Sequence, residues 1–144
     1  VYLFIQRVIK MVLPLVSARK MRTLVVDQDI EQRRFVERSL TALGYYRTTT
    51  ASCFDELIAL THYSPSLAER FDLLIVSASI FTKRNMYWFD FCLGNARLKH
   101  VLVSDSDKRS NEIERFTDRS DQHVWRVQDV NTHVLRTLIP CIDF

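Results

Sequence analysis

Three polar side chains stand where strand-like stretches of this sequence end. Asp27, Ser77 and Ser104 each come directly after a short run of apolar and β-branched residues. Such runs are typical of strands buried on both faces of a parallel sheet. Because open α/β sheets collect functional groups at the carboxyl ends of their strands, we expect the three side chains to converge. The runs are Thr23–Val26, Leu73–Val76 and Val101–Val103.

A carboxylate beside two hydroxyls could bind a small ligand or support hydroxyl chemistry. A serine nucleophile needs a base beside it, and no histidine or lysine adjoins Ser77 in the sequence. Glycine-rich phosphate-binding loops are also missing, because the chain contains only two glycines, Gly44 and Gly94. The sequence therefore excludes a dinucleotide-binding motif or a P-loop, and we expect that the chain is not an enzyme.

Metal and nucleic-acid sites are not indicated either. The four histidines lack the spacing of metal ligands, and the three cysteines are widely spaced without a CxxC motif. We expect the thiols to be buried and reduced in a cytoplasmic protein. The net charge of +3 is too small and too dispersed to indicate direct nucleic-acid binding. We therefore expect no metal and no cofactor. The residues concerned are His62, His100, His123, His133, Cys53, Cys92 and Cys141.

Strand and helix patterns alternate along the chain from Met21 onward. The first helix is predicted over Asp29–Leu43, where Asp29 and Gln32 have the form of an N-terminal capping box and Gly44 follows the end. Five strand–helix units in about 120 residues favour a parallel five-stranded sheet with helices on both faces. The other predicted strands are Tyr45–Ala51, Leu73–Val76, His100–Ser104 and Val124–Val127, and the other predicted helices are Phe54–His62, Met86–Leu98, Lys108–Phe116 and Val130–Ile139.

Residues 1–20 form an N-terminal segment distinct from the folded domain, which we place at residues 21–144. Val1–Leu13 is strongly apolar, and its polar residues Gln6, Arg7 and Lys10 share one helical face. The run is too short and too charged for a membrane span, which needs about 20 apolar residues, and it lacks the pattern of a secretion signal. Two interpretations stay open: an amphipathic docking helix, or a segment upstream of a natural start at Met21.

Several motifs resemble the receiver domains of bacterial two-component response regulators. LVVDQD at Leu24–Asp29 is similar to the family's first strand and acidic pair, TALGY at Thr41–Tyr45 to the end of its first helix, and FDLLIVS at Phe71–Ser77 to its third strand. Asn85 stands where the family usually has a glycine. The resemblance covers Met21 to about Ile142. It implies a flavodoxin-like, doubly wound α/β fold with strand order 2-1-3-4-5.

The phosphorylation pocket that the resemblance implies is degenerate in this sequence. Asp27 keeps the first acid of the metal-binding pair, whereas Gln28 replaces the second and Ser77 replaces the aspartate that accepts the phosphoryl group. Ser104 keeps the hydroxyl position, and Gln128 stands in place of the lysine that pairs with phosphoryl oxygens. A receiver needs a carboxylate nucleophile, carboxylate ligands for Mg²⁺ and a cation for the phosphoryl group. We therefore expect no aspartyl phosphorylation.

The resemblance thus implies a pseudo-receiver that signals by protein–protein contact, independently of phosphorylation. The expected contact surface is the face made by the fourth helix, the fifth strand and the fifth helix. Trp125 stands there at the family's aromatic switch position with Arg126 beside it, and both residue types are frequent interface anchors. The partner is a signalling protein or a second copy of the chain. The alternative is a small-ligand-binding or enzymatic domain that reuses the pocket around Asp27, Ser77 and Ser104.

Overall fold

The computed structural model describes residues 20–62, 71–95, 97–117 and 122–142 of the chain. These residues form a six-stranded sheet with strand order β2-β1-β3-β4-β6-β5. Five strands run parallel, and β5 at one edge pairs antiparallel with β6. The strands are β1 (Arg22–Val26), β2 (Arg47–Ala51), β3 (Leu73–Ser77), β4 (His100–Ser104), β5 (Glu114–Thr117) and β6 (His123–Val127).

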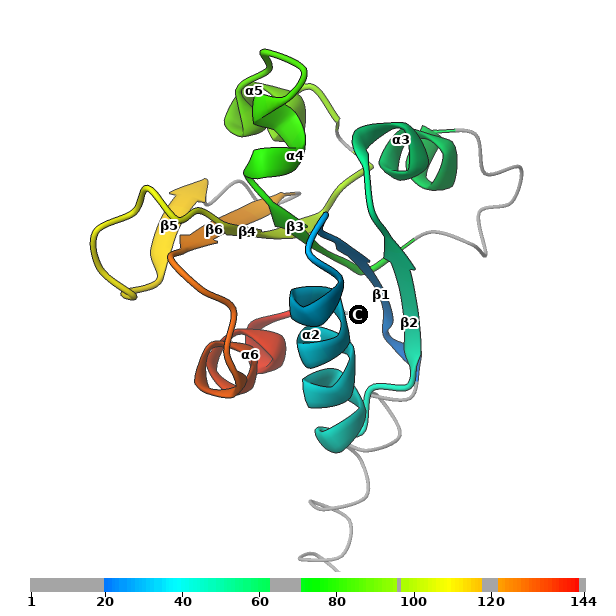
Figure 1. The fold of residues 1–144 in the computed structure, drawn as a ribbon. Coiled ribbons are helices and arrows are strands. Elements are labelled where there is room, and N and C mark those ends of the chain that lie inside the picture. The colour runs from blue at the N-terminus through cyan, green and yellow to red at the C-terminus, as the bar shows by residue number, and fades with distance from the viewer. Residues whose placement is uncertain (1–19, 63–70, 96, 118–121, 143–144) are drawn as a thin grey trace, which may run out of the picture.

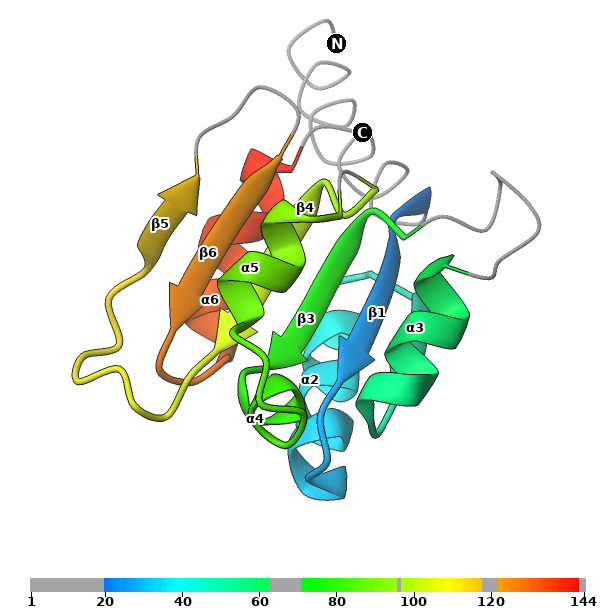
Figure 2. The same cartoon turned by 90° about the horizontal axis from the view of Figure 1, so that it is seen from above.

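Helices cover both faces of this sheet (Figure 1). The first and last described helices, α2 and α6, lie on one face, and α3, α4 and α5 lie on the other, in front of the sheet in Figure 2. The helices are α2 (Ile30–Ala42), α3 (Phe54–His62), α4 (Ser79–Thr82), α5 (Trp88–Leu93) and α6 (Thr132–Leu138), which continues into the short 3-10 helix η2 (Ile139–Cys141).

Side chains of alternating residues in the parallel strands pack into two hydrophobic cores, one on each face of the sheet. Val25 packs with Leu40 in the core under α2 and α6, whereas its neighbour Val26 packs with Phe81 in the core under α3, α4 and α5. This two-sided burial explains why the strands read as continuous apolar runs. The predicted flavodoxin-like α/β fold is confirmed, and the five predicted strands occur in the predicted order, with the predicted fifth strand observed as β6.

The prediction of a fourth helix over Lys108–Phe116 is wrong. The chain turns after β4 and then forms the strand β5, which adds a sixth, antiparallel strand to the sheet. Polar side chains stabilise the turn instead of a helix: Asp105 Oδ1 accepts from the Asp107 N–H at 3.1 Å, and Lys108 Nζ donates to the Ser110 carbonyl at 3.1 Å. Such local side-chain bonds compete with helical hydrogen bonding. Phe116 then packs against Trp88 and Phe89.

The predicted third helix, Met86–Leu98, is shorter than expected. The regular helix α5 spans Trp88–Leu93 and follows the separate short helix α4. Gln122, which is only 3% exposed, fixes the end of α5 from outside. Its Nε2 donates to the carbonyls of Cys92 at 2.6 Å and Leu98 at 3.1 Å. A side chain from the segment between β5 and β6 therefore adds hydrogen bonds at the carboxyl end of α5 and just beyond it.

Two residues adopt the left-handed backbone conformation. Gly44 has a φ of 96° directly after α2, and Asn85 has a φ of 52° between α4 and α5. Glycine pays no steric cost in this region, and asparagine tolerates it better than most residues.

The apolar extension Val1–Lys20 lies, apart from Lys20, outside the described residues. Among the helices that are described, none combines the length and apolar character needed to cross a membrane.

Candidate functional site

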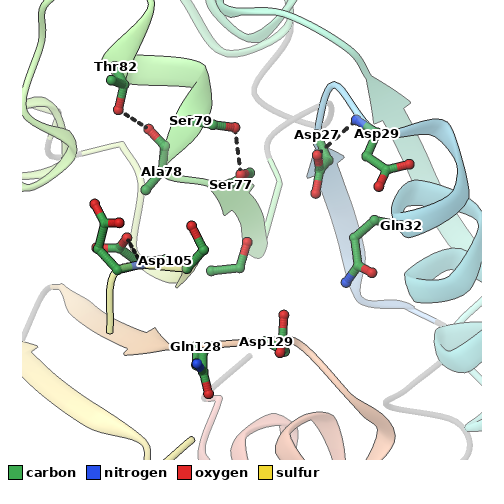
Figure 3. Close-up of a pocket in the computed structure, with 13 residues that line it drawn as sticks. Asp27, Asp29, Gln32, Ser77, Ala78, Ser79, Thr82, Asp105, Gln128 and Asp129 are labelled. Carbon is green, nitrogen blue, oxygen red and sulfur yellow. Dashed lines mark hydrogen bonds between the residues drawn. The ribbon is translucent and has the colours of Figure 1, made fainter. Parts of the chain in front are cut away.

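A cavity of about 430 Å³ opens at the carboxyl ends of the parallel strands (Figure 3). Four of the five residues predicted for the degenerate pocket line it, namely Asp27, Ser77, Ser104 and Gln128. Gln28 does not; it lines a neighbouring cavity of about 80 Å³. The larger cavity is also lined by residues that sequence reasoning gave other roles or did not assign: Asp29, Gln32, Ala78, Ser79, Thr82, Asp105, Ser106, Asp107 and Asp129.

Strand register brings the predicted residues together. Ser77 and Ser104 are directly paired at the ends of β3 and β4, and the Ala78 N–H continues the ladder by donating to the Ser104 carbonyl at 2.8 Å. On the far side of β4, the Asp105 N–H donates to the Val127 carbonyl at 2.8 Å, which places Gln128 at the same edge. Parallel strands in register end at one edge of a sheet, so residues far apart in sequence meet there.

A chain of hydrogen bonds connects Gln28 to Ser77 through Ser79. Gln28 Nε2 donates to Ser79 Oγ at 3.0 Å, and Ser79 Oγ lies 2.8 Å from Ser77 Oγ. Because Ser79 accepts from the amide, its own proton is free to bond Ser77 Oγ. Ser79 was not predicted as a site residue. Its position two residues after Ser77 was visible in the sequence, but its link to Gln28 depends on the meeting of β1 and β3.

Asp27 is held at the end of β1 by the loop that follows it. Its Oδ1 accepts from the Asp29 N–H at 3.0 Å, while Arg33 Nη1 from α2 donates to the Asp27 carbonyl at 2.6 Å. Burial raises the pKa of the Asp27 carboxyl above its usual range, and the nearby charge of Asp29 raises it further. The hydrogen bond from the Asp29 N–H acts in the opposite direction. The site therefore favours the neutral form of Asp27 more than water does.

Asp29 caps α2, but the predicted capping box is incomplete. Asp29 Oδ1 accepts from the Glu31 N–H at 3.0 Å, as an N-cap side chain does. Gln32 does not return to the cap; its Nε2 donates to the Val130 carbonyl at 3.5 Å, across the cavity edge. The Asp29 N–H, to which a capping box would bring the Gln32 side-chain oxygen, donates instead to Asp27 Oδ1 at 3.0 Å.

The predicted contact surface is not formed as expected. Trp125 is only 4% exposed and lies in the core under α2 and α6, where its ring stacks with His100 at a centroid distance of 6.1 Å. The prediction of Trp125 as an exposed interface anchor is therefore wrong. Arg126 is paired with Asp105 and Glu114. The fourth helix of that predicted face is replaced by β5.

The thiols and histidines fall only partly where the sequence placed them. Cys92 is buried, as predicted, whereas Cys53 and Cys141 are exposed; all three are free. His100 and His123 face each other across β4 and β6 with a ring distance of 5.3 Å, although 22 residues separate them in the sequence. Within the described part of the chain, no group of three or more histidine, cysteine, aspartate or glutamate residues is arranged to hold a metal ion.

The charge of the cavity is strongly one-sided. Its thirteen lining residues include no lysine or arginine. Five of them are aspartates, namely Asp27, Asp29, Asp105, Asp107 and Asp129. Figure 3 shows Asp27, Asp105 and Asp129 on different sides of the cavity.

Comparison with known proteins places the fold. No family model matches the chain, and no curated protein matches its sequence. Its structure is similar to that of the chemotaxis response regulator CheY4 of Vibrio cholerae, with a TM-score of 0.56 and 20% sequence identity. The match covers 85% of this chain and 98% of CheY4. At this level of identity the likeness establishes a shared flavodoxin-like fold.

Proposed function

We propose that this chain is a degenerate receiver domain, a pseudo-receiver that acts in signalling by protein–protein contact and without phosphoryl transfer. The observation that carries the proposal is the Gln28–Ser79–Ser77 hydrogen-bond chain. By the resemblance to receivers, Gln28 and Ser77 stand at positions of a metal-binding acid and the phospho-accepting aspartate. Here both side chains bond to Ser79 within the protein.

The serine at the acceptor position lacks the means to act as a substitute nucleophile. An acyl phosphate requires a carboxylate, and a serine requires a base to take its proton. The partner of Ser77 Oγ is the hydroxyl of Ser79, which is not a base at neutral pH. This supports a domain that is not an enzyme.

The residues at this edge do not fit the Mg²⁺ ion that the receiver fold implies. Mg²⁺ demands near-octahedral oxygen ligands, usually with one or two carboxylates. Gln28 supplies a neutral amide that bonds Ser79, and Asp27 Oδ1 accepts from the Asp29 N–H. The described residues contain no acidic group of three arranged for a metal. The lining residues also offer no cation for a phosphoryl group, since Gln128 stands at the lysine position.

Treatment with acetyl phosphate and Mg²⁺, followed by intact-mass spectrometry, tests this proposal. We expect no phosphoryl adduct on the full chain, while a phosphorylatable receiver treated in parallel gains one. A stoichiometric adduct labile to hydroxylamine would show an acyl phosphate and would contradict the proposal. Affinity capture from the source cell should meanwhile recover a signalling protein or a second copy of the chain, and a Ser77→Ala variant should capture the same partner.

We further propose that the domain works in the cytoplasm. The three cysteines are free in the structure, and two of them are exposed. Exposed free thiols persist in a reducing compartment, whereas oxidising compartments favour disulfides.

A second candidate function is the binding of a small cationic ligand in the acidic cavity. The observation that favours it is the five aspartates around a space of about 430 Å³, which is within the usual range for ligand pockets. A thermal-shift screen of polyamines and guanidinium compounds tests this alternative. A shift that disappears in an Asp129→Asn variant would support it, and no shift across the screen would dispose of it.

A further inference from the structure

Arg126 in β6 joins two segments that no strand ladder connects directly. Its Nε and Nη2 both lie 3.0 Å from Asp105 Oδ2, and its Nη1 lies 3.2 Å from Glu114 Oε2. The guanidinium also lies over the ring of Phe116, 6.0 Å from its centroid. One side chain therefore contacts the end of β4 and two residues of β5.

The two carboxylates differ in their surroundings. The Asp105 side chain is 13% exposed and that of Arg126 is 22% exposed, whereas that of Glu114 is 45% exposed. Ion pairs shielded from water are screened less than exposed ones. Asp105 is therefore the principal partner of the guanidinium, which it contacts through Nε and Nη2. The remaining nitrogen, Nη1, contacts Glu114.

Asp105 also organises the turn that lines the cavity. Its Oδ1 accepts from the Asp107 N–H, and its carbonyl accepts from the Lys108 N–H, both at 3.1 Å. Asp105 and Asp107 are lining residues of the cavity. The same carboxyl group thus contacts the cavity wall with one oxygen and Arg126 with the other.

β5 has few other attachments. It is a four-residue edge strand, and its pairing with β6 shifts register between Arg115 and Thr117. A bulge of this kind weakens the local ladder. On the helical side, the described contacts of β5 are the packing of Phe116 on Trp88 and Phe89, with ring distances of 4.8 Å and 5.1 Å.

We propose that Arg126 couples the turn at the cavity to the edge strand β5, so that β5 stays ordered only while Asp105 holds the guanidinium. Without Asp105 the long side chain of Arg126 regains rotamer freedom and its charge loses its most shielded partner. Its bond to Glu114 and its contact with Phe116 then weaken together. β5 stands in the sequence where a receiver has its fourth helix. The coupling therefore links the cavity to the part of the sheet that departs from the receiver pattern, and it stands independently of the signalling role proposed above.

Hydrogen–deuterium exchange on the full chain tests the coupling. In an Asp105→Asn variant, asparagine keeps an oxygen for the Asp107 N–H but removes the charge. We expect exchange in a peptide covering Ile113–Thr117 to become about tenfold faster, with β1 and β3 unchanged. Asp107→Asn is the matched control: it removes a neighbouring charge from the same cavity without touching Arg126, and β5 should keep its protection. Equal protection of β5 in Asp105→Asn and in the wild type would overturn the proposal.

Arg126→Lys and Glu114→Gln keep the test decisive if Asp105→Asn unfolds the domain. Lysine retains the charge but loses the fork that reaches both carboxylates. Arg126→Lys should therefore accelerate β5 exchange nearly as much as loss of Asp105. Glu114→Gln should have a smaller effect on β5, because it removes the more exposed of the two ion pairs. Unchanged β5 exchange in Arg126→Lys would show that Arg126 does not transmit order from Asp105.

Discussion

Ser77 and Ser104 lie directly opposite each other at the ends of β3 and β4. The same cavity contains Asp27 at the end of the strand on the other side of β3. These are three of the positions at which the resemblance to receivers implies phosphoryl chemistry. The fold brings these positions to one cavity, and we propose that their side chains do not support that chemistry. The behaviour of this edge can be tested by restoring or removing charge.

Replacing Ser77 by aspartate alone should destabilise the fold. The new carboxylate would share the cavity with Asp27 and four other aspartates, with no lysine or arginine among the lining residues. Like charges sharing a site disfavour ionisation, and we expect a loss of roughly 1 to 3 kcal/mol in the free energy of unfolding at pH 7. Urea denaturation measures this, with Ser77→Asn as the uncharged control of equal size; equal midpoints for the two variants would contradict it.

Restoring the three lost groups together should restore cation binding. The triple variant Gln28→Asp, Ser77→Asp, Gln128→Lys supplies the carboxylates and the cation that the receiver pattern requires. We expect Mg²⁺ to raise the melting temperature of the triple variant and to leave that of the wild type unchanged, as measured by calorimetry. The variant lacking only the Gln128 substitution separates metal binding from the effect of the new lysine.

Asp27→Asn should stabilise the domain at neutral pH. Burial raises the pKa of Asp27 in the folded state, so the folded chain binds this proton more tightly than the unfolded chain does. The contribution of Asp27 to stability is therefore highest below the unfolded pKa and is lost as pH rises through the folded pKa. Asparagine removes this decline. In urea denaturation from pH 3 to pH 8, the wild type and the variant should have similar midpoints at acid pH. At neutral pH the variant should have the higher midpoint.

Asp29→Asn provides a partial comparison for the Asp27 experiment. Asparagine is as good an N-cap as aspartate, so α2 should keep its start. The charge of Asp29 is the smaller of the two causes that raise the pKa of Asp27, after burial. This variant should therefore weaken the decline in stability with pH without removing it. If the stability of Asp27→Asn still declines with rising pH as strongly as that of the wild type, groups other than Asp27 cause the decline.

Thiol titration should separate the three cysteines. Burial raises the pKa of Cys92 to about 12, and its side chain has no exposed area, whereas Cys53 and Cys141 are exposed. Because the thiolate is the reactive form, Cys92 should react only when the domain opens. A disulfide reagent at pH 8 should label Cys53 and Cys141 quickly and Cys92 at the rate of unfolding. A Cys92→Ala variant identifies the slow thiol, and three equally fast thiols would contradict the buried position.

Trp125→Ala should destabilise the fold instead of weakening an interface. Trp125 is 4% exposed and stacks with His100 within the core under α2 and α6. Emptying such a site costs about 3 to 5 kcal/mol, which shifts the urea midpoint strongly. Trp125→Phe keeps a ring in the core and should lose less. Unchanged stability of the alanine variant, together with weaker self-association in analytical ultracentrifugation, would contradict the buried position and show that Trp125 contributes to an interface.

Sequence reasoning predicted the parts of the fold that local patterns encode. The apolar runs before Asp27, Ser77 and Ser104 gave buried parallel strands, because residues buried on both faces leave a continuous signal. Gly44 and Asn85 were identifiable since few residue types accept a left-handed backbone. The meeting of Asp27, Ser77 and Ser104 at one edge also followed from the strand pattern, because parallel strands in register end together, whereas Gln128 was placed there by the resemblance to receivers.

Contacts between distant segments decided the rest. The end of the predicted helix Lys108–Phe116 belongs to the strand β5 (Glu114–Thr117), where Phe116 packs on Trp88 and Arg126 bonds Glu114. Gln28 bonds Ser79, and Gln32 bonds the Val130 carbonyl, each across tens of residues in the sequence. Trp125 lies in the core because the face of β6 that carries it is covered by α6. The sequence by itself determined which segments form the five parallel strands, since that depends on local hydrophobicity. The tertiary structure decided the edge strand and the hydrogen-bond partners at the cavity, since these depend on which side chains the fold brings together.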